Sequence, residues 1–96
     1  MLITGTPEEQ AAAQKKILNR LRRAQGQLGG VINAMESGAS CRDVVTQLAA
    51  VTSALDRAGF AIISTAMRDC VIDPEKTQEV EGLTADDLEK LFLSLA

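Results

Sequence analysis

The sequence predicts an all-α fold, because apolar residues recur at helical spacing over two long stretches and one short one. Capping residues stand at the expected helix starts, and no stretch alternates as a strand does. We expect a single domain over residues 1–96 with three helices, the first two forming an antiparallel hairpin. Three helices enclose little core, so we expect two chains to form an antiparallel four-helix-bundle dimer.

The first helix is predicted to begin at Pro7, with Thr6 as its N-cap, and to end near Ser37, before Gly38. Residues 1–6 are expected to be frayed. One side of this helix is apolar, with helical spacing between its members. These members are Ile17, Leu21, Ala24, Leu28, Val31 (or Ile32) and Met35.

Three glycines interrupt the same helix at positions 26, 29 and 30. Each costs about 1 kcal/mol inside a helix. We therefore expect a partner helix or a phosphate to approach the backbone closely there.

A basic flank runs along the first helix. Residues 14–35 hold five Lys and Arg and no acid, whereas residues 69–96 hold eight acids and two bases. The net charge of −3 therefore conceals a local positive field. Five bases exceed what a solvated helix face needs, so we predict binding of double-stranded DNA, mainly through its phosphates. The residues that share this flank are Lys16, Arg20, Arg23 and Gln27.

The second helix is predicted from about Ser40 to about Val71 and carries the only two cysteines, Cys41 and Cys70. A separation of 29 residues returns to within about 20° of the starting direction and spans about 43 Å. A disulfide needs Cα atoms within about 7 Å, so these thiols cannot meet within one helix. They can meet across a dimer in which the second copy runs antiparallel. Arg57 lies roughly opposite the cysteines and is expected to be exposed.

The positions of the two thiols suggest different roles. Cys41 stands at a helix N-terminus beside Arg42, where the helix dipole stabilises a thiolate, so we interpret it as the attacking thiol. Cys70 stands at the opposite helix end and fits a resolving role. The alternative is that both are structural cysteines that pack as small apolar residues.

The remaining chain is predicted to close the second helix at Asp73-Pro74, followed by a polar connection over residues 74–83. Thr84 then caps a short third helix whose apolar positions include Leu88 and Phe92. We find neither a signal peptide nor a membrane span, and therefore expect a cytoplasmic protein with reduced thiols. The chain lacks histidine and any Cys-x-x-Cys motif, which argues against a thiol oxidoreductase or another enzyme, and we expect no cofactor.

The segment LNRLRRAQGQ at residues 18–27, followed by Gly30-Val31, resembles the first-helix signature of the CsoR/RcnR family of all-helical bacterial repressors. Ser40-Cys41, the long second helix and Cys70 extend the resemblance over residues 10–95. The resemblance implies a homotetramer of two four-helix-bundle dimers. It also implies operator DNA bound through a surface that includes Arg20 and Arg57, and release when an inducer acts at the cysteines.

The cysteine surroundings distinguish branches of this family. In its copper sensors a Cys, a His and a second Cys bind Cu(I) across the dimer, but here Ala66 takes the place of the His and Ser40 that of a neighbouring Tyr. Its nickel/cobalt sensors need several His, and its formaldehyde sensors carry Pro where this chain has Leu2. Cysteines without His resemble the persulfide-sensing CstR branch.

Our leading hypothesis is therefore a repressor that senses persulfide or polysulfide through an inter-subunit Cys41–Cys70 pair, with Ser40, Arg42 and Ala66 around the thiols. Cys70 of one chain would then attack the sulfur-modified Cys41 of the other to form a di-, tri- or tetrasulfide bridge, and this bridge would release operator DNA. The closest alternative is a Cu(I)-responsive repressor that uses the same two thiolates as metal ligands. A structural helical oligomer without a sensing role is the third reading.

Overall fold

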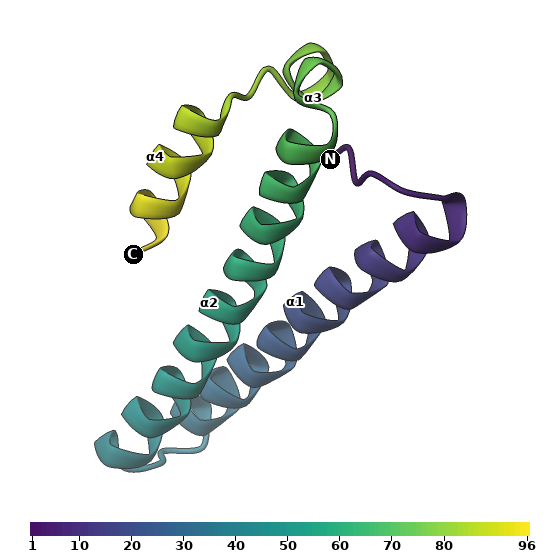
Figure 1. The fold of residues 1–96 in the computed structure, drawn as a ribbon. Coiled ribbons are helices and arrows are strands. Elements are labelled where there is room, and N and C mark those ends of the chain that lie inside the picture. Colours follow the sequence, from purple (N-terminus) through teal and green to yellow (C-terminus); the bar gives the residue numbers. More distant parts are fainter.

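The computed structural model describes all 96 residues and contains four α-helices and no strand (Figure 1). The helices are α1 (Pro7–Glu36), α2 (Cys41–Ile72), α3 (Pro74–Glu81) and α4 (Ala85–Leu95). The predicted all-α class is confirmed, and both long helices fall within one residue or so of their expected ends. The predicted number of three helices is wrong.

The two long helices form an antiparallel hairpin. At the start of α1, the Thr6 hydroxyl accepts the Glu9 backbone N–H, and the Glu9 carboxylate accepts the Thr6 N–H in return. After α1 the chain turns at Gly38, whose φ of +77° lies in the left-handed region that favours glycine. Figure 1 shows α1 and α2 close together near this turn and diverging toward their other ends.

Most of the buried residues of the hairpin line the seam between its helices. Small and branched residues dominate this seam, so the helices pack through short side chains. Only 11 of the 96 residues are buried, so one chain leaves much of its apolar surface uncovered. The seam residues are Ile17, Ala24, Val31 and Ala34 of α1 with Val51 and Ala58 of α2, whereas Ile63 lies near Leu88 of α4 and Asp69 bonds the N-terminal segment.

Helix α3 replaces the polar connection that we predict over residues 74–83. The Asp73 carboxylate accepts the Lys76 backbone N–H at 3.0 Å, and Pro74 occupies the first turn. Gly82 ends the helix with a φ of +67°. These start and stop residues were visible in the sequence, but the segment is too polar to show helical periodicity.

Helix α4 packs along the C-terminal half of α2 (Figure 1). Leu88 is fully buried, and the rings of Phe60 and Phe92 lie 5.5 Å apart. A Cβ at Gly59 would meet a Leu95 methyl carbon at 3.0 Å, so a larger residue there would displace the Leu95 side chain by a few tenths of an ångström. The predicted cap at Thr84 is confirmed, because its hydroxyl accepts the Asp87 N–H.

The N-terminal segment is anchored rather than frayed, which corrects our expectation for residues 1–6. The buried Asp69 carboxylate accepts the backbone N–H of Ile3 at 3.0 Å and that of Thr4 at 2.7 Å. Gln10 donates to the Ile3 carbonyl at 2.9 Å, and the Ile3 side chain is buried. Ile3 has a φ of +52°, which is strained for a β-branched residue. The segment thereby crosses from α1 back to α2 at the open end of the hairpin (Figure 1).

Candidate functional site

A groove between α1 and α2 gathers most of the residues that we predict to contact DNA. Arg20, Arg23 and Gln27 of α1 and Arg57 of α2 line it, together with small side chains of α2, and its volume is 340 Å³. The Arg20 guanidinium donates to the Arg57 carbonyl at 3.2 Å, which holds this side chain across the groove. No acid lines the groove, so it can attract an anion over its whole length.

A second groove of 530 Å³ continues the first along the hairpin and shares Arg20 with it. Lys16 of α1 and Arg68 of α2 line this groove, and Glu9 is the one acid there. Lys16 was predicted from the basic flank, whereas Arg68 was missed. The signal for Arg68 was its distance of 11 residues from Arg57, which returns to within about 20° of the same direction on a helix.

We call the surface formed by Lys16, Arg20, Arg23, Gln27 and Arg57 the cationic face. None of its side chains forms an ion pair within the chain, whose one salt bridge joins the Met1 amino group to Glu81 at 3.4 Å. Gln27 differs from the basic members because its Oε1 is buried without a hydrogen-bond partner. The positive charge of this face is therefore fully available to a partner outside the chain.

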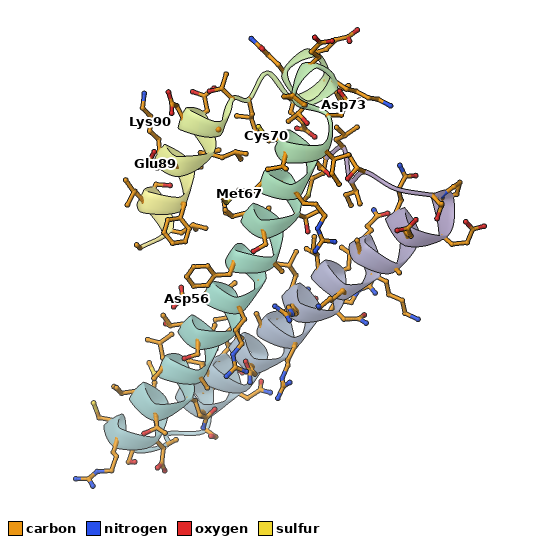
Figure 2. The ribbon with its side chains drawn as sticks, viewed as in Figure 1. Asp56, Met67, Cys70, Asp73, Glu89 and Lys90 are labelled. Carbon is orange, nitrogen blue, oxygen red and sulfur yellow. The ribbon has the colours of Figure 1, made fainter.

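The two thiols lie at opposite ends of α2. Cys41 is the first residue of the helix and is exposed, whereas Cys70 is half-buried in the last turns, close to Asp73 (Figure 2). Both are free thiols, and the helix rise places them about 43 Å apart. The structure therefore does not bring the predicted pair together within one chain.

The three predicted neighbours of the thiols, Ser40, Arg42 and Ala66, contribute no strong metal ligand. Ser40 is exposed and its hydroxyl is occupied as the N-cap, where it accepts the Asp43 N–H at 3.2 Å. Arg42 is exposed beside Cys41, and Ala66 is half-buried one turn before Cys70. No group of three or more Cys, Asp or Glu side chains within the chain could hold a metal ion. A metal at this site would need ligands from more than one chain.

An apolar face lies beside Cys41 on the side of the hairpin away from the cationic face. Leu48 is nine residues before Arg57, which places it about 180° around α2 from this arginine. Leu48 is 46% exposed and Leu55 is 51% exposed, although both belong to the predicted apolar stripe of the cysteine side. In the other half of α2 this stripe is covered by α4. The members of the apolar face are Leu18, Leu21, Leu28, Ile32 and Met35 of α1 with Val45, Leu48 and Leu55 of α2.

The glycines of α1 have no close neighbour within the chain. A Cβ at Gly26 or Gly29 would meet nothing within 4 Å, and one at Gly30 would stand 3.5 Å from the Gln47 side-chain oxygen. The predicted close approach to these glycines is therefore absent from the single chain, and it stays a prediction for a partner helix or a phosphate.

A family model described as metal-sensitive transcriptional repressor matches residues 13–94. The chain belongs to this family. The family identification from the sequence is confirmed, and so is the expectation that the protein is a repressor-family member rather than an enzyme. None of its helices combines the length and apolar character that crossing a bilayer requires.

Individual relatives show how far the likeness extends. The copper-sensing transcriptional repressor CsoR of Mycobacterium tuberculosis is 36% identical over 80 residues, which cover 79% of this chain and 67% of the relative. CsoR of Mycobacterium ulcerans is 42% identical over 57 residues, 59% of this chain and about half (49%) of that protein. The uncharacterized protein YrkD of Bacillus subtilis is 43% identical over 61 residues, 62% of this chain and 97% of YrkD. No solved structure matches the chain.

Proposed function

We propose that this chain is one protomer of a repressor that binds operator DNA through its cationic face and releases the DNA when an inducer joins thiols of two protomers. The observation that carries this proposal is the unpaired positive charge along the groove between α1 and α2 in a member of a repressor family. Arg57 is 16 residues beyond Cys41, which places the two about 160° apart around α2. DNA and inducer would therefore bind on different sides of the hairpin.

The assembly that we propose is a dimer of antiparallel hairpins, with two dimers forming a tetramer. Its support is the exposed apolar face, which would be costly in water and which a second copy could cover. Because α2 would run antiparallel to its copy, Cys41 of each chain would approach Cys70 of the other. Each dimer would then hold two thiol pairs.

Copper(I) is the inducer that the named relatives favour, since those in M. tuberculosis and M. ulcerans are copper-sensing repressors. Thiolates are the protein ligands that Cu(I) prefers. Cys41 and the Cys70 of a second protomer would supply two thiolates, and neither Ala66 nor Ser40 offers a third donor of comparable strength. The residues therefore fit a copper site with fewer protein ligands than the family's Cys-His-Cys pattern provides.

A persulfide is the second candidate inducer, and it is supported by Ala66, which stands where the family's copper sensors carry the His of their Cys-His-Cys pattern. The Cys41 thiolate would attack the sulfane sulfur of a persulfide RSSH, which forms a Cys41 persulfide and releases the thiolate RS⁻. The Cys70 thiolate of the other protomer would then attack the inner sulfur of Cys41. That step forms the inter-chain disulfide and expels HS⁻, so the sulfane sulfur is the electron acceptor. Longer bridges would form if both cysteines carried extra sulfur.

One experiment tests the proposal and separates the two inducers. Operator DNA is first selected from the region upstream of the protein's own coding sequence, and its binding to the reduced protein is followed by fluorescence anisotropy. Chelator-buffered Cu(I) and, in a parallel sample, an organic persulfide are then added. Allosteric couplings of about 1–3 kcal/mol predict that affinity falls by about 5- to 150-fold with the true inducer.

The control variants are Cys41→Ser and Cys70→Ser, which should bind DNA normally and respond to neither reagent. Release by Cu(I) alone would identify a copper sensor, and release by persulfide alone would identify a persulfide sensor. A reduced protein that binds no selected DNA, or serine variants that still respond, would contradict the proposed function.

A further inference from the structure

On α2 the linings of the two grooves follow a period of 11 residues. The first groove is lined by Ala50, Ser53, Ala54 and Arg57, and the second by Ala61, Ser64, Thr65 and Arg68 together with Phe60. The same residue type recurs at three of the four positions, and Thr65 takes the place of Ala54. Eleven residues return to within about 20° on a helix, so both sets face the same side of α2.

The positions on α1 follow the same period, but their residues differ. Gln27, Arg23 and Arg20 of the first groove correspond to Lys16, Ala12 and Glu9 of the second, and Arg20 lines both grooves. Each groove thus places basic side chains of α1 opposite a serine and an arginine of α2. Guanidinium groups and hydroxyls are both common donors to phosphate oxygens.

We propose that Arg68 is a further DNA-contacting residue, which forms with Ser64 and Lys16 a second phosphate-binding position equivalent to the one at Arg57 and Ser53. This inference rests on the proposed function, because it extends the same DNA-binding surface. Arg68 is exposed and has no ion pair, so its charge is free for a ligand. It stands two residues before Cys70, which brings the DNA surface close along the chain to the sensor thiol.

The two positions contact different phosphates in this arrangement. Arg57 and Arg68 are separated by about 16 Å along α2, whereas successive base pairs rise by about 3.4 Å along each strand. Their contributions are therefore expected to add. Glu9 marks the end of the surface, because its carboxylate lines the second groove beyond Lys16.

The test measures how operator affinity depends on salt for the reduced full-length protein, using Arg57→Gln, Arg68→Gln and the double variant. Each phosphate contact that is lost lowers the slope of log K against log salt by about 0.9. We expect the slope of each single variant to fall by about 0.9 for every phosphate contact that its arginine makes in the complex. The slope of the double variant should fall by the sum of the two single changes. Arg68→Lys keeps the charge and should keep most of the slope.

Arg22→Gln is the matched control, because Arg22 is exposed on α1 and lines neither groove. It should leave the slope at the wild-type value, and thermal melting should show that every variant is folded. If Arg57→Gln lowers the slope and Arg68→Gln does not, the second position is wrong while the proposed function stands. If Arg68→Gln instead changes the sedimentation of the free protein and leaves the slope unchanged, the groove faces another protomer and the inference is overturned. If the wild type shows no salt-dependent DNA binding, the proposed function itself fails.

Discussion

The two faces of the hairpin differ in what they need from their surroundings. The cationic face is composed of long charged side chains that water already solvates, and its charges have no partner within the chain. The apolar face exposes eight large apolar side chains, including Leu48 and Leu55, next to the thiol of Cys41. The cationic face is stable in water and can bind an anionic ligand. Exposure of the apolar face to water is unfavourable unless another chain covers it.

This contrast explains how one small chain can provide two kinds of surface. The helical repeat places cationic residues such as Arg20 and apolar residues such as Leu28 on different sides of each long helix. The proposed DNA-binding surface is therefore separate from the proposed subunit interface. Variants on the cationic face should therefore change DNA affinity without changing assembly, and variants on the apolar face should change assembly.

A Leu48→Glu substitution should break the apolar face. A carboxylate buried without a partner costs about 3–5 kcal/mol, so we expect dimers to dissociate into monomers at micromolar concentration. Analytical ultracentrifugation measures this change. Thr46→Glu is the control, because Thr46 is exposed about 160° around α2 from Leu48 and should leave assembly unchanged. If the Leu48→Glu protein sediments like the wild type, the apolar face is not the dimer interface.

An Arg20→Gln substitution should weaken the cationic face without affecting assembly. Arg20 lines both grooves, and losing charge-assisted hydrogen bonds costs about 1.5–3 kcal/mol, so operator affinity should fall by at least about tenfold. Lys15→Gln removes the same charge from an exposed position outside both grooves and should have a smaller effect. Fluorescence anisotropy measures the affinity and sedimentation the assembly. Equal losses for the two variants would mean that only net charge matters.

An Asp69→Asn substitution should loosen the segment that closes the open end of the hairpin. The Asp69 carboxylate accepts two backbone N–H groups, and an amide retains only one acceptor oxygen. We expect the free energy of unfolding to fall by about 1–3 kcal/mol, as for an unsatisfied buried donor. Urea denaturation measures it, with the exposed Asp56→Asn as a control near zero. Equal midpoints for the two variants would show that the N-terminal segment contributes nothing to stability.

The smallest expected effect on stability comes from the capping carboxylates at the starts of α1 and α4. Hydrogen bonds from the Thr6 backbone and side chain hold the pKa of Glu9 below its ordinary value of 4.5, and those from Thr84 hold the pKa of Asp87 below 3.8. Because both folded values are depressed, these carboxylates stabilise the fold above their ordinary pKa values. This contribution is lost as the pH falls through the folded values.

We therefore expect Glu9→Gln and Asp87→Asn to reduce the loss of stability between about pH 6 and pH 3. Urea midpoints measured across this range check the prediction. Glu8→Gln removes a first-turn carboxylate that forms no capping bond, and it should show a smaller change. Wild-type pH dependence in both cap variants would contradict the assigned role of the caps.

The sequence was sufficient for the parts of the fold that local chemistry decides. Thr6 and Thr84 were each predicted as caps, and the structure confirms both. The cationic groove was also predictable, because residues of α1 at helical spacing must share a side. Arg68 was not predicted, because it is a single basic residue between Met67 and Asp69 and lines the groove only through the packing of α1 against α2.

What the sequence did not predict depends on contacts between distant residues. The anchoring of Ile3 and Thr4 requires the carboxylate of Asp69, which is more than 60 residues away along the chain. The sequence could not show which part of the apolar stripe of α2 is buried. In the structure α4 covers the half near Gly59 and leaves the half near Leu48 exposed. Helix α3 was not predicted because its polar sequence lacks apolar periodicity, so that only its capping residues, Asp73 and Gly82, indicate a helix.

A subunit-mixing experiment tests whether Cys41 of one protomer meets Cys70 of another. Cys41→Ser protein and isotopically labelled Cys70→Ser protein are unfolded, mixed and refolded together, then treated with the thiol oxidant diamide and weighed by intact mass spectrometry. Each mixed antiparallel dimer keeps one complete thiol pair, so we predict a covalent dimer that contains one labelled and one unlabelled chain. Neither variant alone should form it. A mixture that stays monomeric by mass, although sedimentation shows mixed dimers, would contradict the account.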